Sequence, residues 1–197
     1  RLISTLEEEG KLNRALEYLP DDATLQEREA EHTGLTRPEL SVLIAYAKAD
    51  IKNEVLASEV PEDPWLSQAI KRSFPEAILQ RYAEPLQQHR LKRELITTML
   101  VNELVDHMGI TFVHRLRDTA GLSVPDIVRG YAVSRDVFDL VNIWNAIEGL
   151  DNRVEAGLQL QLMHDLIRMM RRATRWFIRN RFTGLTAREA VDHFAPR

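Results

Sequence analysis

Two histidines and a glutamate in the middle of the chain have the spacing best suited to acid–base or metal chemistry. Glu103 lies four residues before His107, so the two share a helix face, and His114 follows seven residues later. Such side chains could hold a metal ion, but Gly109 is expected to end the helix between the histidines. We therefore expect His107 and His114 to form surface or interhelix hydrogen bonds, and His89 to be structural as well.

A second group of candidate residues is a run of arginines near the carboxyl end of the chain. No acidic residue interrupts the run, which comprises Arg168, Arg171, Arg172, Arg175, Arg179 and Arg181. Four members recur at helical spacing and should share one face of a helix, namely Arg168, Arg172, Arg175 and Arg179. Most apolar neighbours fall on the other side, where we expect a core of Met169, Met170, Ala173, Trp176 and Phe177.

This arginine face has three possible roles. It can be a solvated surface whose guanidinium groups pair with carboxylates of neighbouring helices. It can dock on an acidic surface of the parent chain or of a partner subunit. It can also bind phosphate or nucleic acid, although the net charge of −4 argues against a general nucleic-acid binder. The lack of interleaved acids weakens the first role, so we carry the docking face forward as the candidate site.

Motifs that bind nucleotides or activate a nucleophile are absent from the sequence. The eight glycines are isolated and no two form a G-x-G, so we expect no dinucleotide-binding turn. The chain has no cysteine, which excludes disulfides and thiol catalysis. No apolar run approaches the ~20 residues that a membrane span needs. We therefore expect no catalytic, cofactor-binding or metal-binding residue, no nucleic-acid or membrane partner, and a reducing, cytoplasmic location.

Helices must position these residues, and the clearest one begins within Gly34–Lys52. Thr36 and Glu39 have the spacing of a capping box, and Pro38 falls in the first turn, where its missing N–H costs nothing. The expected apolar stripe of this helix comprises Leu40, Leu43, Ile44, Ala47, Ile51 and Val55.

Prolines, glycines and caps divide the rest of the chain into further helices. Pro85 should break or kink a helix just before it, because its ring clashes with the preceding turn. Another helix should begin at Ser123 and run as far as Glu148, with an interruption near Ser134. The longest helical stretch, over 154–182, carries the arginines.

The whole pattern predicts an all-α fold without a sheet. We find no alternating run of β-branched residues bounded by turn signals. The helix lengths favour a bundle of long antiparallel helices with short capping helices. We expect a single helical domain over 1–197, with N-terminal helices over 1–60 and the main bundle over 61–197. Because the chain opens on Arg1 instead of Met, we expect it to be a fragment of a longer polypeptide.

Several long strings of residues resemble one known family. They are "LEYLPDD" (16–22), "GLTRPELSVLIAYAK" (34–48), "HRLKRELITTMLVNELVDHMGITFVHRL" (89–116), "IWNAIEGLDNRV" (143–154) and "RRATRWFIRNR" (171–181). In this order they are similar to the C-terminal region of the large bacterial NAD-specific glutamate dehydrogenases, and the resemblance covers nearly the whole chain. One departure is Asp106, where the family pattern suggests asparagine.

The resemblance implies a parent enzyme that oxidises L-glutamate to 2-oxoglutarate and ammonia while it reduces NAD. The glutamate-binding lysines and the glycine turn for NAD belong to the central region of such enzymes, and nothing in this chain matches them. NAD is thus expected for the parent and not for this segment. The expected partners are the catalytic region of the same polypeptide and other subunits of a homo-oligomer. The alternative is a helical module that recruits a separate regulatory protein.

Overall fold

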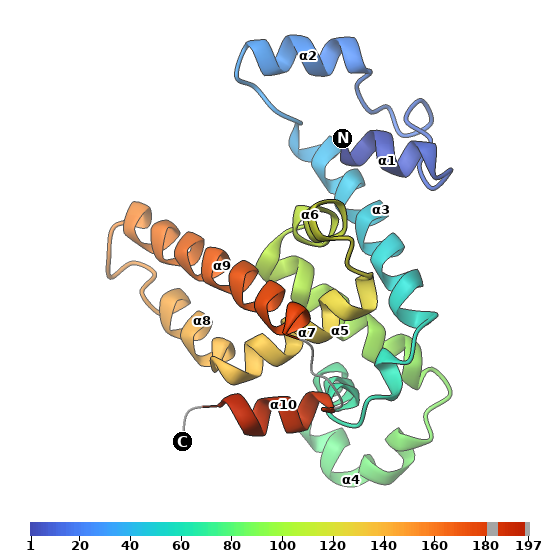
Figure 1. Cartoon of the computed structure of the whole chain (residues 1–197), viewed down its shortest axis with the longest axis vertical. Coiled ribbons are helices and arrows are strands. Elements are labelled where there is room, and N and C mark those ends of the chain that lie inside the picture. Colours follow the sequence, from blue (N-terminus) through green and yellow to red (C-terminus); the bar gives the residue numbers. More distant parts are fainter. Residues whose placement is uncertain (181–184, 196–197) are drawn as a thin grey trace. The chain divides into compact units, whose positions relative to one another are not determined.

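The chain folds into helices, as predicted from the sequence. The computed structural model describes residues 1–180 and 185–195, and within these ranges it has helices and no strand (Figure 1). The all-α prediction is therefore confirmed. The chain divides into two compact units, Arg1–Asn53 and Glu54–Arg197. The predicted single domain stays a prediction, and each unit is described by itself.

The first unit contains α1 (Leu2–Glu8), α2 (Asp22–Ala30) and most of α3 (Arg37–Leu56). The Asp21 side chain caps α2 by accepting a hydrogen bond from the Thr24 N–H at 2.8 Å. A small apolar core joins α1, the turns that follow it and α3; it comprises Ile3, Leu6, Leu12, Leu19, Leu43, Ala47 and Ile51.

The predicted start of α3 is present, but one residue of its predicted stripe is not buried. The Glu39 carboxylate accepts hydrogen bonds from the Thr36 N–H at 2.7 Å and from Arg28 at 2.8 Å. Leu43, Ala47, Ile51 and Val55 are buried and Ile44 is half-buried. Leu40 is 42% exposed, so its assignment to the stripe was wrong. It lies in the first turn, before the buried row begins at the next turn.

The second unit is built around α5 and α7. Its elements are η1 (Val60–Glu62), η2 (Leu66–Ser73), α4 (Glu76–Gln87), α5 (Lys92–Met108), α6 (Thr111–Ala120), α7 (Val124–Val137), α8 (Leu140–Glu148), α9 (Ala156–Arg179) and α10 (Ala187–Phe194). Helix α7 is the most extensively buried of them, and it packs against α5, α6, α8, α9 and α10 (Figure 1). Helices α8 and α9 form a hairpin joined by a turn at 149–155.

Two helix interruptions in this unit lie at or near a proline and an aspartate. Tyr82 leaves the helical region at φ −127°, three residues before Pro85, as the predicted kink requires. The predicted interruption near Ser134 was wrong, because Ser134 is buried inside α7 and donates a hydrogen bond to the Gly130 carbonyl at 2.7 Å. The break lies at Asp139, which adopts a left-handed conformation with φ 51°. Aspartate is one of the few residues that tolerate this conformation.

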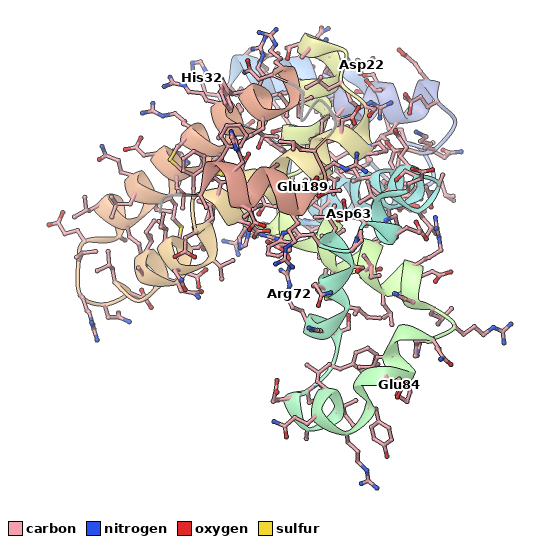
Figure 2. All side chains as sticks on the ribbon, turned by 60° about the horizontal axis from the view of Figure 1, so that its bottom comes forward. Asp22, His32, Asp63, Arg72, Glu84 and Glu189 are labelled. Carbon is pink, nitrogen blue, oxygen red and sulfur yellow. The ribbon has the colours of Figure 1, made fainter. Side chains whose placement is uncertain are left out.

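Helix α10 returns to the beginning of the second unit. Thr186 and Glu189 form the predicted capping box at its start. Just before η2, the Asp63 carboxylate accepts hydrogen bonds from the Trp65 N–H at 2.9 Å and from the Leu66 N–H at 3.1 Å. Figure 2 shows Glu189 beside Asp63, and the two residues line a shared cavity of about 610 Å³.

Within the described ranges, no helix combines the length and apolarity needed to cross a bilayer.

Candidate docking site

The orientation of α9 is set by the face that it buries. Its buried residues are Leu166, Met170, Thr174 and Phe177. On the same side, Ile178 approaches α7 so closely that a Cβ on Gly130 would lie 2.6 Å from its Cγ1. Because a helix advances 100° per residue, this contact fixes which side chains face away from α7. The arginine face is among them.

The four predicted docking arginines do lie together on the outer side of α9. Arg168, Arg172 and Arg179 are exposed, and Arg175 is half-buried. Arg168, whose side chain is 71% exposed, pairs with Asp165 of the same helix at 2.8 Å. Among the described residues, Arg172, Arg175 and Arg179 have no ion pair with a carboxylate. Arg181 lies outside the described residues.

The buried part of two guanidinium groups also lacks partners. The Nε atoms of Arg171 and Arg175 are buried and have no hydrogen-bond partner among the described residues. A guanidinium has five N–H donors, and donors removed from water without an acceptor are costly. The described carboxylates of neighbouring helices therefore do not satisfy these two Nε–H groups.

The buried apolar side of α9 is narrower than predicted from the sequence. Met170 and Phe177 are buried as expected, whereas Met169 is 36% exposed and Trp176 is 49% exposed, so their assignment to the core was wrong. The spacing explains the difference, because Met169 and Trp176 lie three and four residues from Arg172 and share its side of the helix. The spacing places them beside Arg172, but it does not by itself decide which apolar residues of α9 are buried.

An open groove of about 750 Å³ lies beside these exposed residues. Phe138 at the end of α7 and Phe194 in α10 line it together with Met169 and Trp176 of α9. The Phe194 ring lies edge-on to Trp176 at 5.7 Å and to Phe177 at 5.3 Å, and Phe138 lies 6.4 Å from Phe177. Arg168, Arg172 and Asp165 also line the groove. The groove thus combines an aromatic surface with two cations, a composition enriched at protein interfaces.

His107 forms an interhelix hydrogen bond, as expected from the sequence. His107 Nδ1 lies 2.9 Å from the Tyr131 hydroxyl, and its ring lies 4.5 Å from the Trp144 ring. Burial lowers the pKa of His107, and burial raises the pKa of Tyr131. Within the described residues, no cluster of potential ligands could hold a metal ion.

Glu103 belongs to a buried ionic network that the sequence analysis missed. Its carboxylate accepts two bonds from Arg135 Nη1, both at 2.9 Å, and it also pairs with Arg72. Arg135 Nε donates to Asp136 at 2.6 Å, and Asp136 in turn accepts from the Trp65 indole at 2.6 Å. These residues come from η2, α5 and α7, and no local motif links them. The network joins three elements, and none of its residues lines the groove beside α9.

Comparison with known protein families gives one match over most of the chain. The family model described as "Glutamate dehydrogenase, C-terminal" matches residues 32–197. Proteins described as "NAD-specific glutamate dehydrogenase" from Halomonas elongata and Pseudomonas aeruginosa are each 48% identical over all 197 residues. A protein of the same description from Mycobacterium tuberculosis is 35% identical over 193 residues, or 98% of this chain. The chain spans 12% of the length of each of these relatives.

Proposed function

This chain belongs to the family of glutamate dehydrogenase C-terminal regions, and we propose that it is the helical C-terminal part of an NAD-dependent glutamate dehydrogenase. The whole enzyme would convert L-glutamate, NAD and water to 2-oxoglutarate, ammonia and NADH. In this proposal the segment holds no catalytic residue and binds no NAD. It supports the enzyme by packing on the catalytic region of the same polypeptide or between subunits of a homo-oligomer in the cytoplasm.

The observation that carries the proposed supporting role is the arginine face of α9, most of whose guanidinium groups lack a carboxylate partner within the described part of the chain. Arg172, Arg175 and Arg179 have no ion pair among the described residues, although the chain as a whole has a net charge of −4. Exposed arginines next to aromatic side chains are a favourable composition for a protein interface. Charge complementarity at such an interface contributes orientation and specificity more than raw affinity, which suits a contact within one enzyme.

The titratable groups with unusual surroundings support a structural role for the segment. His107 and Tyr131 hydrogen-bond to each other between α5 and α7, and Arg135 is held by Glu103 and Asp136. Perturbed groups at an active site usually line a cleft that is open to substrate. Here they join helices, so their contacts fit a scaffold better than a catalytic centre.

Deletion of residues 1–197 from the complete enzyme tests the proposal. We expect glutamate-dependent NADH formation to fall strongly, and we expect NAD binding by the remaining polypeptide, measured by calorimetry, to persist. Undiminished turnover would contradict a supporting role. Loss of NAD binding together with NAD binding by the isolated segment would contradict the assignment of the cofactor to the rest of the enzyme. Binding of a separate protein, with turnover unchanged, would favour a recruiting module.

A further inference from the structure

The outer side of α9 carries a second row of residues at the spacing of a helix-pairing surface. The row, which we call the exposed seam, comprises Leu158, Leu162, Asp165, Met169, Arg172 and Trp176. Successive members are separated by four, three, four, three and four residues, and Arg179 continues the alternation. This 3.5-residue period is the one by which two α-helices keep a continuous contact along their length.

We propose that the exposed seam of α9 pairs with an acidic amphipathic helix of the same polypeptide that lies outside residues 1–197. This inference rests on the proposed function, and it adds the kind of element that occupies the docking face. The occupant presents apolar side chains to the seam and carries carboxylates opposite the arginines.

The apolar residues of the seam are exposed to solvent, which favours a binding partner that covers them. Leu158 and Trp176 are each 49% exposed, and Leu162 and Met169 are each 36% exposed. From Leu158 to Trp176 the seam extends about 27 Å, since each helical residue rises 1.5 Å. A row of this length and regularity differs from the isolated apolar residues found on any protein surface.

The shape of the surface favours a helix as the occupant. The groove of about 750 Å³ is open to solvent and lies along α9. Its opposite wall includes Phe138, which follows α7, and Phe194 of α10. Met169 and Trp176 belong both to the groove and to the seam. An amphipathic helix that lies in such a groove inserts anchors at helical spacing, which matches the apolar members of the seam.

Charge favours an acidic occupant. Residues 166–180 contain five arginines and no aspartate or glutamate. Arg172 lies within the seam itself, so a helix that covers it must supply a carboxylate, because a buried unpaired charge is strongly unfavourable. An antiparallel second copy of α9 would place residues 156–165 against the arginines, and these contain the single acid Asp165. A parallel second copy would oppose arginines to arginines.

The length of the relatives favours an occupant from the same polypeptide. The chain aligns over its full length with two NAD-specific glutamate dehydrogenases, yet it spans only 12% of each. Most of each relative therefore lies outside this segment and is covalently linked to it. A tether raises the effective concentration of a matching helix, so a modest interface is enough for stable pairing.

Photo-crosslinking in the complete enzyme tests the inference. The variants Trp176→p-benzoylphenylalanine and Met169→p-benzoylphenylalanine place the photoreactive group in the seam. Leu160→p-benzoylphenylalanine is the control, because Leu160 is 60% exposed on the same helix but lies outside the seam. After irradiation and proteolysis, mass spectrometry identifies the crosslinked peptide.

We expect both seam positions to crosslink to one segment outside residues 1–197 that is rich in aspartate and glutamate, and the control position to leave it unlabelled. Introduction of Arg172→Glu should lower the crosslink yield from Trp176→p-benzoylphenylalanine several-fold. Crosslinks to residues 1–197 of another copy, crosslinks to a separate protein, equal labelling from the control, or no crosslink would overturn the inference. The deletion experiment above is independent of these outcomes, so a failed crosslink and a failed supporting role are distinguishable.

Discussion

Gly130 of α7 and Ile178 of α9 are in such close contact that a Cβ at residue 130 would lie 2.6 Å from Ile178 Cγ1. The same Cβ would lie 3.4 Å from Thr174 Cγ2. This contact brings the two helix backbones together and determines which residues of α9 face outward. The position of the arginine face thus depends on a glycine in a different helix.

Gly130→Ala should lower the free energy of unfolding. Overpacking a core costs about 1–3 kcal/mol, whereas replacing glycine in a helix gains roughly 0.5–1 kcal/mol. The expected net loss can be measured by urea denaturation. In the Ile178→Ala background the clash is removed, so Gly130→Ala should become neutral or stabilising. A stabilising effect of Gly130→Ala in the wild-type background would contradict the close approach of α7 and α9.

Ile51→Ala should destabilise the first unit more than Leu40→Ala. Ile51 is fully buried in α3, and truncation of a buried isoleucine costs about 2–5 kcal/mol. Leu40 is 42% exposed, so its truncation should cost well under half as much. Half-buried Ile44 should give an intermediate loss. Thermal unfolding of the three variants provides the ranking, and equal losses would show that α3 packs differently.

Glu39 should make the stability of α3 depend on pH. The Arg28 guanidinium and the Thr36 N–H lower the pKa of Glu39 to about 2. A lowered pKa in the folded state gives stability that is complete above the ordinary pKa of 4.5 and is lost as the pH falls toward 2. The difference in melting temperature between wild type and Glu39→Gln should therefore shrink from pH 6 to pH 2. Glu31→Gln, at an exposed position, is the control and should show no such convergence.

His107 should also make the free energy of unfolding fall as the pH falls, but over a higher pH range than Glu39. Burial lowers the pKa of His107 below 6.5, and the charged groups facing it are Glu103, Asp106, Glu148 and Arg135. The unfolded chain then binds a proton more readily than the folded one, so stability falls as the pH falls below about 6.5. His107→Gln should reduce the loss of stability between pH 7 and pH 5.5, as measured by urea denaturation. The same change at exposed His164 should leave that loss unaltered.

The ends of helices could be predicted from the sequence where they depend on local chemistry. The Thr186–Glu189 capping box and the kink before Pro85 follow from residues within one turn of the feature. The break at Asp139 could not be predicted, because no glycine or proline marks it. The Asp139 carboxylate accepts hydrogen bonds from Asn142 Nδ2 at 3.0 and 2.9 Å in the first turn of α8.

The candidate site could be predicted only in part. The shared face of Arg168, Arg172, Arg175 and Arg179 follows from helical spacing alone. The exposure of Met169 and Trp176 does not, because apolar residues occur on both sides of α9 and either side could have been buried. The buried side is the one that packs on Gly130, which lies 44 residues before Thr174 and 48 before Ile178 in the sequence. The network of Glu103, Arg135 and Asp136 likewise depends on contacts between distant elements.

The most direct test of a docking function is charge reversal on α9 in the complete enzyme. The variant carries Arg168→Glu, Arg172→Glu and Arg179→Glu, and it leaves half-buried Arg175 unchanged. Exposed charges contribute less than about 1 kcal/mol each to folding, so the helical circular dichroism should be preserved. The matched control reverses three other exposed arginines, Arg37, Arg115 and Arg153.

The measurement is glutamate-dependent NADH formation at increasing salt, together with the mass of the assembly in solution. We expect the α9 variant to dissociate or to lose about tenfold or more in activity; a tenfold weaker docking equilibrium corresponds to about 1.4 kcal/mol. We expect the control variant to behave as wild type. Equal behaviour of the two variants would show that the arginine face of α9 is only a solvated surface and would contradict the docking function.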